Sequence, residues 1–236
     1  MIRTLDSESS FTIKNVKMKK NEDLQKDVQD AIKWEPLLNA AEIGVTVKNG
    51  VVTLTGVVDS FSKKLEAEDA AKNVDGVKAV VEKIKIRFST TTGAKDDNEI
   101  ASEVLNAFKW NWEVPSDKIK VKVEGGWVTL EGELEWNFQR EAAKKLVNNQ
   151  IGVKGVTNNI KIKLDAYDAV EKKDIENALE RNSSLDDDDI KVKVSGNKVT
   201  LKGTVHSFYQ KDEAERIAWN APGVSIVENE LVIEYN

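Results

Sequence analysis

The stretch VKNGVVTLTGVV at residues 47–58 recurs as VEGGWVTLEGEL at 123–134 and as VSGNKVTLKGTV at 194–205. A shift of 76 residues places the first copy on the second, and a further shift of 71 places the second on the third, with no gap inside a copy. Internal repetition of this length indicates a repeated structural unit. We therefore interpret the chain as three copies of one small domain.

Each of these stretches has the pattern of a β-hairpin. Apolar residues alternate with polar ones on both sides of a short connector, which is typical of two strands that each bury one face. The connector of the first copy is Asn49-Gly50. This pair favours a type I′ turn, in which both central residues have positive φ. We expect the same kind of turn at the equivalent pairs, which are Gly125-Gly126 and Gly196-Asn197.

Helical patterns stand before and after each hairpin. In the first copy Leu24, Val28 and Ile32 recur every four residues, which places them on one face of a helix. A second run with small apolar residues at helical spacing follows the hairpin, and an alternating strand ends each copy. The order in every copy is therefore helix, strand, strand, helix, strand.

This order predicts an α+β fold of three tandem small domains. Each domain is expected to hold a three-stranded mixed sheet with two helices on one face. The last strand should run parallel to the second, because a strand–helix–strand crossover connects them. The expected bounds are an N-terminal tail at 1–20 and domains at 21–88, 97–164 and 170–236.

One glycine recurs inside the second strand of every copy, as Gly56, Gly132 and Gly203. A glycine within a strand usually marks a bulge or a close approach of another part of the backbone. We expect these three glycines to be structural residues that leave room for a helix crossing the sheet.

The composition of the 236 residues excludes several classes of site. The chain has no cysteine, which excludes disulfides and sites built on thiolates. Its net charge of −6 argues against nucleic-acid binding driven by overall charge. No apolar run approaches the roughly 20 residues of a membrane span. The N-terminal residues lack the apolar core of a secretory signal. We expect a cytoplasmic protein if Met1 is the native start, and a periplasmic one if a signal was removed.

No set of residues predicts catalysis. His206 is the only histidine, and it takes the place of Asp59 and Glu135 in the other copies, which indicates a solvated loop position. The four aspartates at 186–189 lack the glycine and the terminal glutamate of an EF-hand calcium loop. We expect no catalytic residue, no metal site and no cofactor.

Lysines gather on the strand faces that point away from the predicted helices. Lysines beside an aromatic side chain suit an anionic phospholipid surface, where each positive charge contributes about 1 kcal/mol. On a solvated strand face the same lysines would instead block edge-to-edge aggregation. The third copy is acidic overall, so we expect it to repel an anionic surface unless its charges are segregated by face. The candidate residues are Lys83, Lys85, Arg87, Lys120, Lys122, Trp127, Lys161, Lys163, Lys191 and Lys193, with Lys198 and Lys202 beside them.

Three tryptophans stand at the end of the first helix, Trp34 in the first copy and Trp110 and Trp112 in the second. We interpret them as caps of the hydrophobic core. If they are exposed, they would suit a membrane interface or a protein partner, because an indole combines a large apolar surface with a polar N–H group.

Two short motifs resemble the BON domain. They are the core strand, read as VTLTG at 52–56, VTLEG at 128–132 and VTLKG at 199–203, and the Gly-Val pairs at 76–77, 152–153 and 223–224. The resemblance covers nearly everything after residue 20. It implies a non-enzymatic module, often repeated, of bacterial envelope and stress proteins, among them osmotically inducible periplasmic proteins. The usual role proposed for the family is attachment to phospholipid membranes.

The function expected from the sequence is attachment to an anionic phospholipid surface as part of a stress response. The alternative is a protein-interaction scaffold that uses the open sheet faces and the helix-end tryptophans. Nucleic-acid binding is less expected, because the strands lack the several stacking aromatics of an RNA-recognition sheet.

Overall fold

The computed structural model describes residues 19–88, 95–163, 170–185 and 189–234. They form three domains with the same order of elements. Domain 1 contains α1 (Asn21–Trp34), β1 (Ile43–Lys48), β2 (Val51–Val58), α2 (Phe61–Lys72) and β3 (Ala79–Ile86). Domain 2 contains α3 (Asp97–Trp110), β4 (Ile119–Glu124), β5 (Trp127–Leu134), α4 (Asn137–Asn148) and β6 (Gly155–Ile162). Domain 3 contains α5 (Lys172–Glu180), β7 (Ile190–Ser195), β8 (Lys198–Val205), α6 (Phe208–Trp219) and β9 (Ile226–Ile233). Short 3₁₀ helices, η1 (Ala40–Glu42) and η2 (Ser116–Lys118), precede β1 and β4.

Each domain holds one mixed sheet, which we number as its domain (sheets 1, 2 and 3). In domain 1 the strand order is β1-β2-β3, with β1 antiparallel and β3 parallel to β2. Sheets β4-β5-β6 and β7-β8-β9 repeat this arrangement. The register repeats as well, since Gly56, Gly132 and Gly203 each lie between a first-strand and a third-strand apolar residue. The predicted α+β fold of three tandem mixed-sheet domains is confirmed.

The core of each domain lies between its sheet and its two helices. In α1 the predicted residues Leu24, Val28 and Ile32 are buried. The equivalent buried residues are Ile100, Val104 and Phe108 in α3, and Ile175 and Leu179 in α5. Helices α2 and α6 begin after Ser60 and Ser207, whose hydroxyl groups accept hydrogen bonds from the backbone N–H three residues later. Such caps satisfy donors that the first turn of a helix leaves free.

The recurring strand glycine makes room for backbone, not for a helix. A Cβ at Gly56 would lie 2.0 Å from the carbonyl oxygen of Glu42, the residue before β1. The same atom at Gly132 would lie 2.2 Å from the carbonyl oxygen of Lys118. The expected helix crossing is therefore wrong. The close approach joins the second strand to the segment that enters the first.

Two of the three hairpin turns match the prediction. Asn49 and Gly50 have φ of 53° and 80°, and Gly125 and Gly126 have φ of 60° and 85°. In the third turn only Gly196 has positive φ, so the expectation of two such residues is wrong there. The side-chain Nδ2 of Asn197 donates a hydrogen bond of 2.6 Å to the carbonyl of Gly223, which ties this turn to the start of the last strand.

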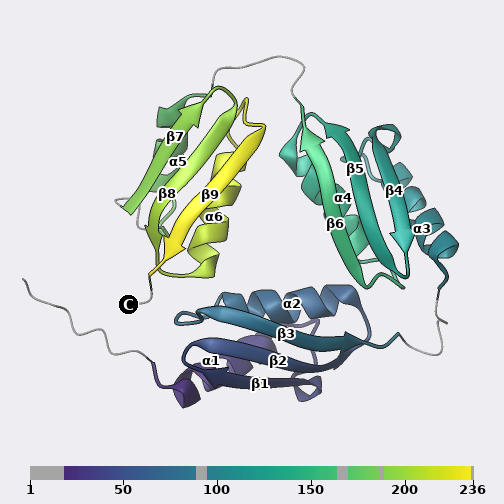
Figure 1. Cartoon of the computed structure of the whole chain (residues 1–236), viewed down its shortest axis with the longest axis vertical. Helices are drawn as coiled ribbons and strands as arrows, with labels where there is room; N and C mark the ends of the chain where they lie inside the picture. Colours follow the sequence, from purple (N-terminus) through teal and green to yellow (C-terminus); the bar gives the residue numbers. More distant parts are fainter. Residues whose placement is uncertain (1–18, 89–94, 164–169, 186–188, 235–236) are drawn as a thin grey trace, which may run out of the picture.

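The three domains close into a triangle (Figure 1). Helices α2, α4 and α6 lie around the centre, and strands β1, β4 and β7 lie at the periphery. All three sheets face the viewer in Figure 1, with the helices behind them. The molecule thus has two unlike sides, which we call the sheet side and the helix side.

Side chains of one domain pack against the next domain around the triangle. Phe61, the first residue of α2, is buried against the core of domain 2. Phe208, the first residue of α6, packs against the core of domain 1. Between domains 2 and 3, the guanidinium of Arg140 lies 4.3 Å from the centre of the Trp219 ring. In domain 2 the equivalent residue, the first of α4, is Asn137 in place of a phenylalanine.

Candidate functional site

Strand alternation decides which side chains reach the sheet side, because successive residues point to opposite faces. In domain 1 these positions carry Lys48, Lys83 and Lys85, and Arg87 directly follows the end of β3. All four side chains are exposed. None of them forms an ion pair with another described residue, and the outward strand positions of this sheet hold no acidic residue. Lys48 was missed in the sequence. It could have been found from the alternation of the first strand, which places Lys48 on the same face as Gly44 and Thr46.

Apolar residues stand among the basic residues of sheet 1. Val57 and Val81 point to the sheet side and are 37% and 39% exposed. Val51, which stands opposite Lys48 in the register, is partly exposed. The open face of domain 1 therefore combines uncompensated positive charge with exposed aliphatic side chains.

The open face of domain 2 carries all the residues singled out there in the sequence, but their charge is largely balanced. Lys163 forms an ion pair of 3.1 Å with Glu133, and Lys122 forms one of 3.0 Å with Glu124. Lys120 stands opposite Glu131 in the register. The residues placed on this face are Lys120, Lys122, Trp127, Lys161 and Lys163, with the three glutamates between them. These glutamates were not predicted from the sequence.

Domain 3 repeats the balanced pattern. Lys202 lies 2.8 Å from Glu230, and Lys198 pairs with Glu228. The hydrogen bond between the first two raises the pKa of Lys202 and lowers the pKa of Glu230. Lys191 and Lys193 point to the same side from β7 and are exposed. The basic side chains of domain 3 are therefore partly neutralised by neighbours on β9.

Charge is segregated between the two sides of the molecule. The outward positions of the nine strands, together with the residue that directly follows the third strand of each sheet, hold twelve basic and six acidic residues, although the whole chain has a net charge of −6. The basic residues are Lys48, Lys83, Lys85, Arg87, Lys120, Lys122, Lys161, Lys163, Lys191, Lys193, Lys198 and Lys202. The acidic residues are Glu124, Glu131, Glu133, Glu228, Glu230 and Glu234. The sheet side is therefore positive, and the rest of the chain carries the excess of negative charge.

The helix-end tryptophans are exposed, so the interpretation as core caps is wrong. Trp34, Trp110 and Trp112 are 83%, 86% and 89% exposed. An α-helix turns by about 100° per residue. Trp34 follows the buried Ile32 by two residues, which turns its side chain away from the core. Trp110 stands in the same relation to Phe108.

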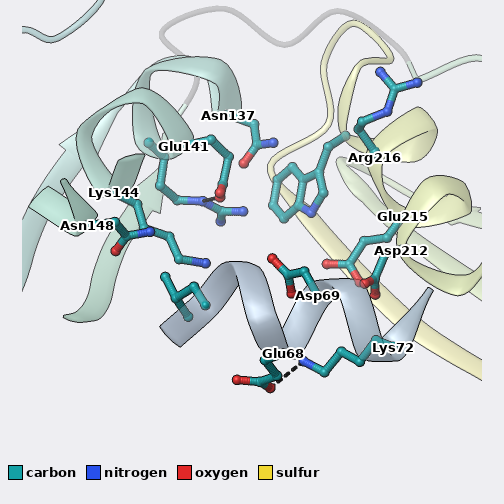
Figure 2. Close-up of a pocket in the computed structure, with 13 residues that line it drawn as sticks. Glu68, Asp69, Lys72, Asn137, Glu141, Lys144, Asn148, Asp212, Glu215 and Arg216 are labelled. Carbon is teal, nitrogen blue, oxygen red and sulfur yellow. Dashed lines mark hydrogen bonds and ion pairs between the residues drawn. The ribbon is translucent and has the colours of Figure 1, made fainter. Parts of the chain in front are cut away.

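A cavity of about 590 Å³ lies at the centre of the triangle, between α2, α4 and α6 (Figure 2). On its floor Lys72 forms an ion pair of 2.6 Å with Glu68. Asp69 points into the cavity from α2, and Asp212 lies beside Glu215 on α6. Burial raises the pKa of Asp69 and of Asp212.

Three polar side-chain atoms in the walls of this cavity are buried and have no hydrogen-bond partner among the described residues. They are Oδ1 of Asn137, Oδ1 of Asn148 and Nε1 of Trp219. Because these atoms are closed to solvent, they do not form part of the open cavity surface. The cavity lining contains no histidine, cysteine or serine. It offers charged groups but no nucleophile next to a base.

The described residues hold no other set that suggests chemistry. His206 follows β8, and its Nδ1 lies 3.3 Å from the carbonyl oxygen of Glu234. No three acidic or histidine side chains of the described chain are grouped so that they could hold a metal ion. Of the acidic run at 186–189, the first three residues lie outside the described residues.

Comparison with known proteins agrees with the three-domain architecture. The BON domain matches residues 20–87, 96–163 and 167–235. Osmotically-inducible protein Y of Escherichia coli (strain K12) is 32% identical over 129 residues, which are 53% of this chain and 64% of that protein. A 21 kDa hemolysin of Actinobacillus pleuropneumoniae is 30% identical over 140 residues, 59% of this chain and 66% of that protein. The chain thus spans slightly less than two thirds of the length of either relative.

A solved structure is also similar over most of the chain. The C-terminal domain of CdsD, a structural protein of the type III secretion system of Chlamydia trachomatis, covers 92% of this chain and 100% of its own at 18% identity. Its TM-score of 0.25 is too low to support a conclusion about the arrangement of domains. None of the described helices has the length and apolar character needed to cross a membrane. Since three BON matches together cover most of its residues, the chain belongs to the BON-domain family.

Proposed function

We propose that the protein is a non-catalytic tandem BON protein of the bacterial osmotic and envelope stress response, and that it attaches to anionic phospholipid surfaces through its sheet side. The observation that carries this proposal is the segregation of charge, with a basic sheet side on a chain of net charge −6. An anionic surface attracts the sheet side and repels the rest, so the same charges would orient the bound protein. Kinship to an osmotically inducible protein supports the role in stress.

Domain 1 should contribute most of the attraction. Its four basic side chains have no acidic neighbours on the sheet face, whereas those of domains 2 and 3 stand beside glutamates. A basic residue near an anionic surface contributes about 1 kcal/mol, and a glutamate next to it removes part of that attraction. The exposed Val57 and Val81 add apolar surface at the same place.

Co-sedimentation with vesicles tests the proposal. Binding is expected to anionic vesicles but not to zwitterionic ones, and it should weaken as salt rises from low to physiological concentration. Lys83→Glu/Lys85→Glu on sheet 1 should reduce binding by about tenfold or more. The matched control is Lys191→Glu/Lys193→Glu on sheet 3, which changes the net charge by the same amount and should reduce binding less. Absence of binding to either vesicle under every condition would overturn the proposal. Equal losses in both variants would show that overall charge, not sheet 1, is recognised.

A protein-interaction scaffold is the second candidate, and the exposure of Trp34, Trp110 and Trp112 favours it. Exposed indoles are common at protein contacts because they bury a large area at low entropic cost. Capture of a protein partner that resists high salt and is lost on Trp34→Ala/Trp110→Ala/Trp112→Ala would favour the scaffold over vesicle attachment.

The location of the protein follows from the same proposal. The comparisons give no support to the cytoplasmic location expected from the N-terminal residues. The periplasmic alternative is compatible with kinship to an osmotically inducible protein, and it would place the sheet side within reach of the envelope membranes. Fractionation of cells that express the protein decides between the two compartments.

A further inference from the structure

A groove of about 280 Å³ lies between the two helices of domain 3, α5 and α6. Two residues of opposite charge line it. Asp174 belongs to the first turn of α5, and Arg181 directly follows the last residue of that helix. The amide side chain of Asn220, which follows the last residue of α6, lines it as well. The rest of the lining is apolar and consists of Ile175, Ala178, Ile217, Ala221 and Pro222.

The two charged side chains of this α5–α6 groove are available to a ligand. Asp174 and Arg181 are exposed, and neither forms an ion pair with another described residue. An α-helix rises 1.5 Å per residue, so the seven positions between them correspond to about 10.5 Å along α5. The groove is therefore complementary in charge to a molecule that carries a positive group and a negative group at this separation.

The carboxylate at the position of Asp174 is neutralised in the other two domains. There a lysine eight residues earlier in the chain forms an ion pair with it. These pairs are Lys19–Asp27, at 3.0 Å, and Lys95–Glu103. The residue eight positions before Asp174 is Ala166, which carries no charge. Domain 3 thus keeps the carboxylate and lacks the lysine that occupies it elsewhere.

The other end of the groove also differs between the domains. Arg181 takes the position of Trp34 in domain 1 and of Trp110 in domain 2. An indole at this position supplies no charge, whereas a guanidinium can donate two parallel hydrogen bonds to a carboxylate. Both changes fall on the same groove, one at each end, and together they give domain 3 alone a pair of unoccupied opposite charges.

We propose that the α5–α6 groove binds a short peptide with free termini, its ammonium group at Asp174 and its carboxylate at Arg181. An extended chain spans about 3.3–3.6 Å per residue, so about three residues bridge the two charges. The side chain of Asn220 has both donors and an acceptor for a peptide group. Because the groove is smaller than most ligand pockets, which hold about 300–1,000 Å³, the peptide should carry small apolar side chains. Both charged ends are exposed, so the affinity is low.

Titration of the ¹⁵N-labelled full chain with trialanine, followed by NMR, tests the proposal. Saturable shifts are expected at the backbone amides of Ala178, Arg181 and Asn220. N-acetyl-trialanine has lost the positive end and trialanine amide the negative end, and each should bind about threefold more weakly than trialanine. The titration contains no membrane, so its outcome is independent of attachment to phospholipid.

Variants assign each end of the peptide to its residue. Asp174→Asn should weaken trialanine about threefold and leave N-acetyl-trialanine unchanged, because that peptide has no ammonium group to lose. Arg181→Gln should likewise weaken trialanine and leave trialanine amide unchanged. Lys173→Gln, at an exposed position of the same helix, makes the same charge change as Arg181→Gln and should alter neither affinity. The same spectra show whether each variant keeps its fold.

Absence of saturable shifts in the groove with trialanine would overturn the proposal. So would equal affinities for the free and the blocked peptides, or variants that weaken all three peptides alike. An aliphatic ω-amino acid of the same length carries both charges without peptide groups, and we expect it to bind more weakly than trialanine. Equal affinity for that compound would overturn the assignment to a peptide.

Discussion

The glycine that recurs in the second strand is required by a contact between two segments of backbone. A Cβ at Gly56, Gly132 or Gly203 would lie 1.8–2.2 Å from the carbonyl oxygen of the residue that precedes the first strand of its domain. A carbonyl group cannot rotate out of the way as a flexible side chain can. Positive φ at these glycines adds strain for any other residue. The clash with the carbonyl oxygen and the positive φ both act on the same residue. We therefore expect substitutions at this glycine to be among the most destabilising in each domain.

Gly132→Ala should lower the free energy of unfolding of domain 2 by about 3 kcal/mol or more. Urea unfolding followed by tryptophan fluorescence measures this, because four of the six tryptophans lie in domain 2. The control is Gly125→Asn, for which we expect a change within about 0.5 kcal/mol. Asn49 holds the equivalent turn position of domain 1 with φ of 53°, and a Cβ at Gly125 would meet no atom within 4 Å. Equal losses in the two variants would contradict the role of the backbone contact.

For the side chains of helices and strands, the sequence predicted the positions that depend on one element and missed the contacts that depend on the register between two. The spacing of Leu24, Val28 and Ile32 predicted a helix with one buried face, because burial within its own domain sets that spacing. The lysines of the open faces were predicted for the same reason, since alternation alone places them. Their glutamate neighbours were not, because the pairing of Lys198 with Glu228 depends on the register between β8 and β9.

Helices α2 and α6 each place a partly buried carboxyl group at the central cavity, Asp69 on α2 and Asp212 on α6. Burial raises the pKa of both groups. Lys72 lowers both pKa values in part. The other charged neighbours are Glu68, Asp212 and Lys144 for Asp69, and Glu215 and Lys211 for Asp212. A carboxyl whose pKa is raised on folding binds its proton more tightly in the folded state. Its cost to stability is therefore full at neutral pH and disappears as the pH falls through the raised pKa toward the ordinary value of 3.8.

Asp69→Asn/Asp212→Asn should raise the midpoint of thermal unfolding at neutral pH, and the gain should shrink as the pH approaches 3.8. Differential scanning calorimetry across this range measures it. Glu213→Gln is a control of opposite sign, because the hydrogen bond from Arg216 lowers the pKa of Glu213. That variant should lower the midpoint at neutral pH, and its effect should fade as the pH falls below 4.5. A gain from the double variant that is independent of pH would contradict the assignment.

In the whole molecule, three contacts between domains close the triangle, and they differ in how well their side chains are packed and hydrogen-bonded. Phe61 anchors domain 1 on domain 2, and Phe208 anchors domain 3 on domain 1. At the remaining contact the equivalent residue is Asn137, whose Oδ1 is buried without a partner among the described residues. An unsatisfied buried polar group costs about 1–3 kcal/mol. The sequence could not reveal these contacts, because each residue packs on a domain other than its own.

Closure of the triangle should depend most on Phe208. Domains 1 and 3 are not consecutive in the chain, so no direct linker keeps them together when their contact is weakened. Phe208→Ser removes the aromatic side chain that packs on the core of domain 1 and should open the triangle, while each domain keeps its own core. Small-angle scattering should then show a radius of gyration larger by several ångströms, with unchanged circular dichroism. Tyr209→Ser, at the exposed neighbouring residue, is the matched control and should leave the scattering curve as it is. A curve for Phe208→Ser that coincides with that of the parent would mean that other contacts hold domains 1 and 3 together. In that case the common orientation of the three sheets would not rest on this phenylalanine.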